Sequence, residues 1–235
     1  MIEMQIITDE KHIDVVVDFA GEYVSGADSG AYDKGYNEGY SAGSLPIYYL
    51  RNCESAWGAA VFPENSKITI RNSGAAVIWR TAFIRAQNLK SIKLISDTLE
   101  GTIQGDSMFR EIKQLELIDL TEFNRKFSSI NYCFLSSDNL KTILGALDVN
   151  ECTKFLLSFG TNSLEDIEFV PNTIKVSIPF NYCSKLTAKS IQSIIDGLAD
   201  LTGQTAQTVS WHSTVLAKLT PEQYSQMINK NWNWN

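Results

Sequence analysis

Apolar residues recur at a regular interval through the middle and C-terminal parts of the chain. Five leucines mark this interval, at separations of 26, 25, 24 and 22 residues: Leu89, Leu115, Leu140, Leu164 and Leu186. A small residue and a phenylalanine precede the leucine, and an Ile-x-Leu pattern follows it. Self-similarity at this interval is typical of a chain built from stacked copies of one structural unit.

Three copies are complete and two are degraded. The complete copies span residues 82–94, 108–120 and 133–145. The fourth has Ser158 where the template expects phenylalanine, with Phe159 one place late. The fifth departs from the template after Leu186.

Each copy predicts a short strand after its leucine, because apolar and polar positions alternate there. We expect one buried row of isoleucines, formed by Ile92, Ile118, Ile143 and Ile167. A second row contains Leu94, Leu120 and Phe169, with Gly145 as a gap. One copy cannot bury its apolar face alone, whereas stacked copies form a continuous core.

The pattern changes to a helical period after the last copy. Apolar residues at 3.6-residue spacing predict an amphipathic helix over residues 188–198, with Thr187 as its N-cap. Thr208–Trp211 alternates as a strand, and Thr220 followed by Pro221 predicts the start of a final helix. We expect this block to cover the end of the stack, with Trp232 and Trp234 either packed against it or exposed as a contact site.

The N-terminal part has different patterns. Residues 4–20 predict two strands around a polar turn, a hairpin that needs a packing partner to be stable. Three Tyr-x-x-Gly units follow, as Tyr32, Gly35, Tyr36, Gly39, Tyr40 and Gly43. They form either an oligomerising helix, with tyrosines and glycines in adjacent rows, or a flexible spacer, because glycine disfavours a helix.

These patterns divide the chain into three regions. Residues 1–45 hold the hairpin and the Tyr-x-x-Gly segment, residues 46–200 hold the repeat domain, and residues 201–235 form a C-terminal cap.

Composition narrows the range of partners. The 235 residues carry 20 Lys and Arg against 27 Asp and Glu, a net charge of −7, so we expect no nucleic-acid partner. No apolar run reaches the roughly 20 residues that span a bilayer. The N-terminus lacks a secretory signal pattern, which predicts synthesis in a cytoplasm.

The residue inventory predicts no enzyme, metal site or cofactor. The four cysteines, Cys53, Cys133, Cys152 and Cys183, lack zinc-ligand spacing, and we interpret them as small buried residues. His12 and His212 are the two histidines. We interpret His12 as a solvated loop residue, because no nucleophile lies near it in the sequence, and His212 beside Trp211 as a strand-end residue. Residues 101–106 contain two glycines but lack the lysine of a phosphate loop, so we predict a turn between copies.

The repeat resembles the BspA-like family of bacterial leucine-rich repeats, whose pattern is Ala-Phe-x-x-Cys-x-x-Leu-x-x-Ile-x-Leu. The resemblance covers about residues 60–200. It implies a mixed α/β fold: a leucine-rich-repeat solenoid of short parallel strands with a helix-strand-helix C-terminal cap, preceded by a small N-terminal β element. The C-terminal block and the upstream Tyr-x-x-Gly tract look like those of repeat proteins encoded in phages and prophages of gut Firmicutes.

Such a sheet offers one broad face for recognition. The second and fourth positions after each anchor leucine face away from the core, and they define a candidate binding face: Ser91, Lys93, Leu117, Asp119, Thr142, Leu144, Asp166 and Glu168. Leu117 and Leu144 in adjacent copies suggest a covered patch or a partner site.

The resemblance implies a non-enzymatic structural protein of a phage virion, in a tail, fibre or surface decoration, that contacts other virion proteins or a host-surface receptor of protein or glycan. The alternative is a bacterial cell-surface adhesion or interaction module of the same repeat family. A weaker alternative is a carbohydrate-binding or enzymatic module, for which Trp57, Trp79 or Trp211 would have to form an exposed platform.

Overall fold

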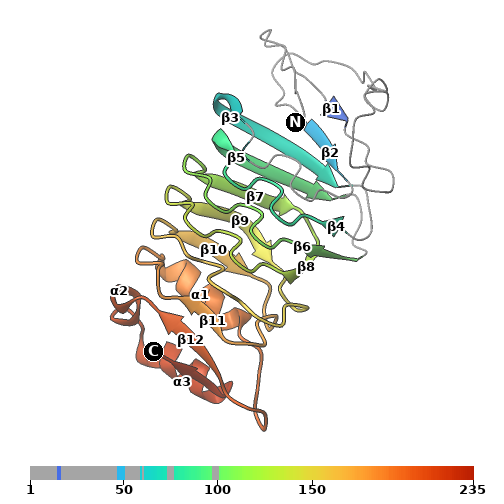
Figure 1. Ribbon diagram of the computed structural model, residues 1–235. Coiled ribbons are helices and arrows are strands. Elements are labelled where there is room, and N and C mark those ends of the chain that lie inside the picture. The colour runs from blue at the N-terminus through green and yellow to red at the C-terminus, as the bar shows by residue number, and fades with distance from the viewer. Residues whose placement is uncertain (1–14, 17–46, 51–58, 60, 73–76, 97–100) are drawn as a thin grey trace.

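Most strands of the molecule belong to one long parallel sheet (Figure 1). The computed structural model describes residues 15–16, 47–50, 59, 61–72, 77–96 and 101–235. The long sheet has the order β1-β2-β3-β5-β7-β9-β10, and its neighbouring strands are parallel. Its strands are β1 (Val15–Val16), β2 (Ile47–Leu50), β3 (Val61–Asn72), β5 (Gln87–Ser96), β7 (Leu117–Glu122), β9 (Thr142–Leu147) and β10 (Asp166–Phe169). The fold is therefore mixed α/β, with parallel strands and few helices, as predicted.

The isoleucine row is buried along this sheet. Ile92 is the register partner of Ile118, and Ile118 is the partner of Ile143. Ile167 lies on the next strand, where the register between β9 and β10 shifts. The four isoleucines are buried, as are Leu94, Leu120 and Phe169 of the second predicted row. Adjacent strands therefore carry equivalent positions of successive copies.

A second, shorter sheet lies across the core from the long one (Figure 1), and the sequence did not predict it. Its parallel strands are β4 (Val77–Ile78), β6 (Thr102–Gln104) and β8 (Lys126–Ser129). The interpretation of residues 101–106 as a turn was wrong for residues 102–104. Their backbone pairs with β4 and β8, so tertiary pairing makes a strand where the flanking glycines favour a turn.

Aromatic rings form a continuous stack inside the molecule. The ring centroids of successive members are 5.6, 5.9, 5.6, 4.6 and 5.8 Å apart along Phe83, Phe109, Phe134, Phe159, Phe180 and Trp211. Offset rings at such separations are attractive beyond the area that they bury. The stack joins the repeat copies to the C-terminal block.

The fourth copy is less degraded than its sequence suggests. Phe134 donates its backbone N–H to Ser158 (3.0 Å), as Phe109 does to Cys133 (3.0 Å). Ser158 is thus the equivalent of the small residue Cys133, and Phe159 occupies the phenylalanine position. The alignment that placed Phe159 one residue late was wrong, because the fourth copy is shorter between its phenylalanine and its leucine.

The turns between the two sheets repeat as closely as the strands do. Thr81, Ser107, Tyr132 and Leu157 have left-handed backbones, with φ of 54°, 55°, 56° and 47°. The same backbone hydrogen bond links each of these turns to the next. The N–H of a left-handed residue donates to the carbonyl of the residue that precedes the next left-handed residue. The donor–acceptor pairs are Thr81–Asp106, Ser107–Asn131 and Tyr132–Leu156, at 2.8–2.9 Å. Left-handed backbone is unfavourable for such residues, so its recurrence marks one turn geometry used repeatedly.

A row of polar side chains supports these turns. The Asp106 carboxylate accepts a hydrogen bond from the backbone N–H of Asn131 (2.8 Å), and the Asn131 side-chain oxygen accepts one from the N–H of Leu156 (3.0 Å). The row ends at Leu156, whose side chain has no hydrogen-bonding group. Each polar side chain thereby binds the copy that follows it.

The C-terminal block forms a third sheet and the helices. The sheet contains β11 (Ile178–Phe180), β12 (Gln207–Trp211) and β13 (Trp232–Trp234), and the helices are α1 (Ala188–Gly197), α2 (Ser213–Leu216) and α3 (Pro221–Asn229). Thr187 caps α1 and Thr220 caps α3, with Pro221 in the first turn, as predicted. Trp232 is buried, and Trp234 packs against Tyr224 with ring centroids 5.1 Å apart.

Helix α1 covers the last edge of the long sheet. The hydroxyl of Ser190 accepts a hydrogen bond from the backbone N–H of Ile167 (2.9 Å), and the hydroxyl of Ser193 accepts one from Phe169 (3.0 Å). Both donors belong to β10. The helix therefore occupies the place of a further strand.

Helix α3 is fastened to α1 through Lys230, which follows it. The Lys230 ammonium donates to the backbone carbonyls of Ile195, Asp196 and Leu198, at 3.0, 3.1 and 2.7 Å. These carbonyls belong to the C-terminal end of α1, where a cation is electrostatically favourable. Burial lowers the pKa of Lys230.

Several predictions fall outside the described residues. These are the predictions for the Tyr-x-x-Gly segment, for the hairpin with His12 but apart from Val15–Val16, for the region boundary near residue 45 and for Cys53. Val15–Val16 pairs in parallel with β2. The three-region division remains a prediction.

Candidate binding face

The candidate face follows the outward side of β5, β7, β9 and β10. Register partners place Ser91, Leu117, Thr142 and Asp166 in one row across the four strands. Lys93, Asp119 and Leu144 form a second row. Seven of the eight predicted residues thus lie in two ordered rows.

Glu168 is displaced from the second row. It pairs with Ala146 instead of Leu144, because the register between β9 and β10 shifts between Asp166 and Glu168. The equal-spacing argument used for the sequence could not detect this irregularity. A bulge of this kind bends a strand and redirects its side chains.

Gly145 permits the irregular backbone of β9. Its φ is +82°, and a Cβ atom at this position would lie 2.7 Å from the carbonyl carbon of Leu120. Only a residue without a side chain fits so close to β7. Next to it, Leu144 is 42% exposed, which makes it the most exposed large apolar side chain of the predicted face.

The charged residues of the face are held by neighbours. The Lys93 ammonium donates to Glu122 and lies 3.9 Å from the Asp119 carboxylate. That carboxylate also accepts hydrogen bonds from the backbone N–H and the hydroxyl of Thr121, at 2.9 and 2.6 Å. The hydrogen bond to Glu122 is the main cause that raises the pKa of Lys93.

The last strand of the face takes its partners from the start of α1. Lys189 donates to Glu168, and this hydrogen bond is the main cause that raises the pKa of Lys189. The Thr187 hydroxyl donates to the Asp166 carboxylate (3.0 Å). The sequence pattern predicts only the helix-cap role of Thr187, and it gives no signal for Lys189. The helix N-terminus therefore extends the face beyond β10.

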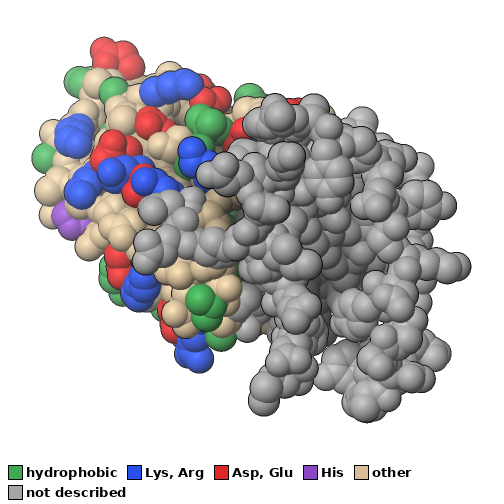
Figure 2. Space-filling view, turned by 90° about the horizontal axis from the view of Figure 1, so that it is seen from above, with side chains coloured by type: hydrophobic (Ala, Val, Ile, Leu, Met, Phe, Trp, Pro, Cys, Tyr) green, Lys and Arg blue, Asp and Glu red, His purple; other side chains and the backbone are tan. Residues whose placement is uncertain are grey.

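Basic and acidic side chains lie next to one another across the described surface, and Figure 2 shows this mixture on one side of the molecule. The face combines such pairs with an exposed leucine and small hydroxyl residues. This combination suits contact with another macromolecule, since a mixed surface supplies both apolar area and directional hydrogen bonds.

The other chemically notable residues are structural. Cys133, Cys152 and Cys183 are buried free thiols, and burial raises the pKa of Cys133 and raises the pKa values of Cys152 and Cys183 to about 12. Thiols with raised pKa values are poor nucleophiles near neutral pH. Within the described ranges, no group of three or more His, Cys, Asp and Glu residues could hold a metal ion.

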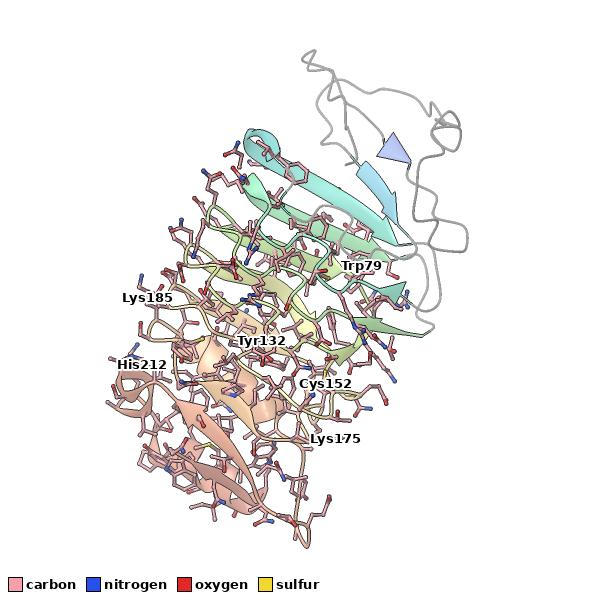
Figure 3. All side chains as sticks on the ribbon, in the orientation of Figure 1. Trp79, Tyr132, Cys152, Lys175, Lys185 and His212 are labelled. Carbon is pink, nitrogen blue, oxygen red and sulfur yellow. The ribbon has the colours of Figure 1, made fainter. Side chains whose placement is uncertain are left out.

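Two of the three tryptophans considered for a platform are in the interior. Trp79 is fully buried and Trp211 is 4% exposed, while Trp57 lies outside the described residues. Figure 3 shows Trp79 and Cys152 within the body of the molecule and His212 at its periphery. The His212 ring accepts a hydrogen bond from the N–H of Thr214 and caps the short helix α2.

No protein-family model, curated protein or solved structure matches this chain. In the part of the chain that the structure describes, no helix is both long and apolar enough to cross a lipid bilayer. The class that the fold defines is a mixed α/β protein with parallel strands in sheets and few helices.

Proposed function

We propose that the chain is a leucine-rich-repeat solenoid that acts as a non-enzymatic binding module through its candidate face. The observation that carries this proposal is the register of β5, β7, β9 and β10, which aligns equivalent outward positions of successive copies into rows. Stacked repeats present such rows as one continuous recognition surface. The backbone hydrogen bonds that join equivalent turns give further support.

Within this class, we propose a structural protein of a phage virion, located in a tail, a fibre or a surface decoration. This proposal is supported by the resemblance of the C-terminal block and of the Tyr-x-x-Gly tract to those of repeat proteins encoded in phages and prophages. The BspA-like family assignment belongs to the same proposal. The partner would be another virion protein or a host-surface receptor.

Two exposed leucines allow a matched test of the face. Leu144 on β9 and Leu156, which belongs to the row of turns between the two sheets and not to the candidate face, are both 42% exposed. We expect Leu144→Arg to abolish binding of the fluorescently labelled full chain to intact Firmicutes cells, and Leu156→Arg to leave it unchanged. Binding that survives Leu144→Arg, or that is lost equally in both variants, would refute the role of the face.

A separate experiment tests the location. Peptides of the chain should be found by mass spectrometry in purified phage particles from lysates of a strain that carries the gene. Their presence at the surface of intact bacteria, and their absence from purified particles, would instead favour the cell-surface adhesion module. The burial of Trp79 and Trp211 disfavours a carbohydrate platform at those two residues.

A further inference from the structure

Among the described residues, five ion pairs join β5 and the turns before it to β7 and the turns before it, and four of them form a regular row. The fifth, Lys93–Glu122, shares its lysine with the row. Lys113–Asp138 is the one ion pair found between the second and third copies in the same part of the chain. The nitrogen–oxygen distances in the row are 4.0, 2.7, 3.7 and 3.9 Å for Arg80–Asp106, Arg85–Glu111, Lys90–Glu116 and Lys93–Asp119. In every pair of the row the acid follows the base by 26 residues, the separation of Leu89 and Leu115. We call these eight residues the ionic seam.

The charges within the seam are sorted by copy. The four bases belong to the first copy and the turn before it, and the four acids belong to the second copy and the turn before it. The hydrogen bond from Arg85 is the main cause that lowers the pKa of Glu111, and the same bond raises the pKa of Arg85. Opposite charges therefore stabilise each other across the junction.

The third copy has a different set at the equivalent positions, 25 residues further along: Asn131, Ser136, Lys141 and Leu144. A first copy stacked on the third would gain no ion pair at these positions, and Lys141 would take the place that Glu116 holds beside Lys90. The apolar template, by contrast, is shared by all three copies. Burial of the phenylalanine, leucine and isoleucine positions alone therefore discriminates weakly between neighbours.

We propose that the ionic seam selects the second copy as the neighbour of the first during folding. It does so against stacking of the first copy on the third copy, whether in the same chain or in another chain. Repeat proteins are prone to such misassembly, and charge pairs discriminate by repelling the wrong partner. The proposal concerns assembly of the fold and does not depend on the proposed function.

Charge reversal on one side and then on both sides tests the proposal. The one-sided variant carries Arg85→Glu and Lys90→Glu, and the two-sided variant adds Glu111→Arg and Glu116→Lys. The control carries Lys154→Glu and Lys175→Glu, two exposed lysines for which no ion pair is found among the described residues. The control and the one-sided variant have the same net charge.

The readout is the fraction of protein that regains the native mass and circular dichroism after dilution from denaturant. We expect the one-sided variant to recover at least about twofold less than the control, because like charges then face each other. In the two-sided variant the refolded fraction should return most of the way to that of the control. This result is expected even if the one-sided variant does not fold at all. Equal recovery of the one-sided variant and the control, or no gain in the two-sided variant, would overturn the proposal.

Discussion

Two junctions of the described repeat region, one near each end, differ in the interactions that stabilise them. The junction between the first and second copies combines the buried Phe83–Phe109 ring contact with the partly exposed ion pairs of the ionic seam. The junction between β10 and the C-terminal block relies on the Ser190 and Ser193 hydroxyls and on the Phe159–Phe180 ring contact. Salt screens such ion pairs and acid protonates their carboxylates, whereas the hydroxyl and ring contacts named at the C-terminal junction are neutral.

The two kinds of interaction contribute differently to stability and to the choice of neighbour. Exposed ion pairs contribute little free energy, typically below about 1 kcal/mol each, but they discriminate between otherwise similar neighbours. Buried rings and satisfied backbone donors contribute more stability. We therefore expect stability to depend chiefly on the buried contacts present at both junctions, and correct pairing of the first two copies to depend on the ionic seam.

The largest effect should come from the aromatic stack. Phe159 is fully buried and contacts the rings of Phe134, Phe169 and Phe180. We expect Phe159→Ala to lower the free energy of unfolding by about 3–5 kcal/mol, because it removes a buried ring and leaves a cavity. Urea unfolding followed by circular dichroism measures this loss. Tyr182→Ala, at a ring that is 49% exposed, is the control and should change stability by less than about 0.5 kcal/mol.

A smaller loss is expected from the bulge in β9. Gly145→Ala should cost at least about 2 kcal/mol, since it combines a left-handed backbone with a clash against Leu120. Gly203 has a similar φ of +78°, but a Cβ atom added there would meet nothing within 4 Å, so Gly203→Ala should cost only about 1 kcal/mol. The same unfolding assay compares the two, and equal losses would show that β9 has room for a side chain.

Next in size is the attachment of α3 to α1. Lys230→Met should cost about 1–3 kcal/mol, because it removes the donor for three backbone carbonyls. Relative to the unsubstituted chain, amide hydrogen exchange in this variant should become faster in α3 and β13 but not in the long sheet. Lys218→Met, at an exposed lysine in the same block, provides the control. Uniformly faster exchange across the chain would contradict a local role.

The smallest effect should be the pH dependence of the ionic seam. The pKa of Glu111 is lowered in the folded state from its usual 4.5, so its stabilising contribution is present above that value and is lost as the pH falls through the folded pKa. Glu111→Gln should therefore make stability less dependent on pH in this acidic range. The measurement is the denaturant midpoint of the unchanged chain and of Glu111→Gln at a series of pH values. If the midpoint depends on pH equally steeply in both, Arg85 does not stabilise the carboxylate.

The sequence predicted the elements that depend on regular spacing. The isoleucine row, helix α1 with its Thr187 cap and the start of α3 at Pro221 followed from apolar periodicity and capping chemistry. The short sheet could not be predicted in this way, because Val77–Ile78 and Thr102–Gln104 are too short to show alternation. Their strand conformation arises from pairing between copies.

The candidate face was predicted where the spacing is constant and missed where it changes. Leu117 and Thr142 are register partners as expected, but the shift between β9 and β10 displaced Glu168. The +26 spacing of bases and acids is present in the sequence, but it falls on polar positions that the apolar template does not include. Charge periodicity thus carries information that hydrophobic periodicity does not.

The serine hydroxyls of α1 also have a consequence for behaviour at high concentration. An exposed edge of a parallel sheet can template the addition of strands from other molecules, which leads to fibrillar aggregation. Because Ser190 and Ser193 already engage the amide groups of β10, that edge has no vacant donors at Ile167 and Phe169 to offer an incoming chain. Helix α1 therefore blocks the addition of a further strand at this edge of the sheet.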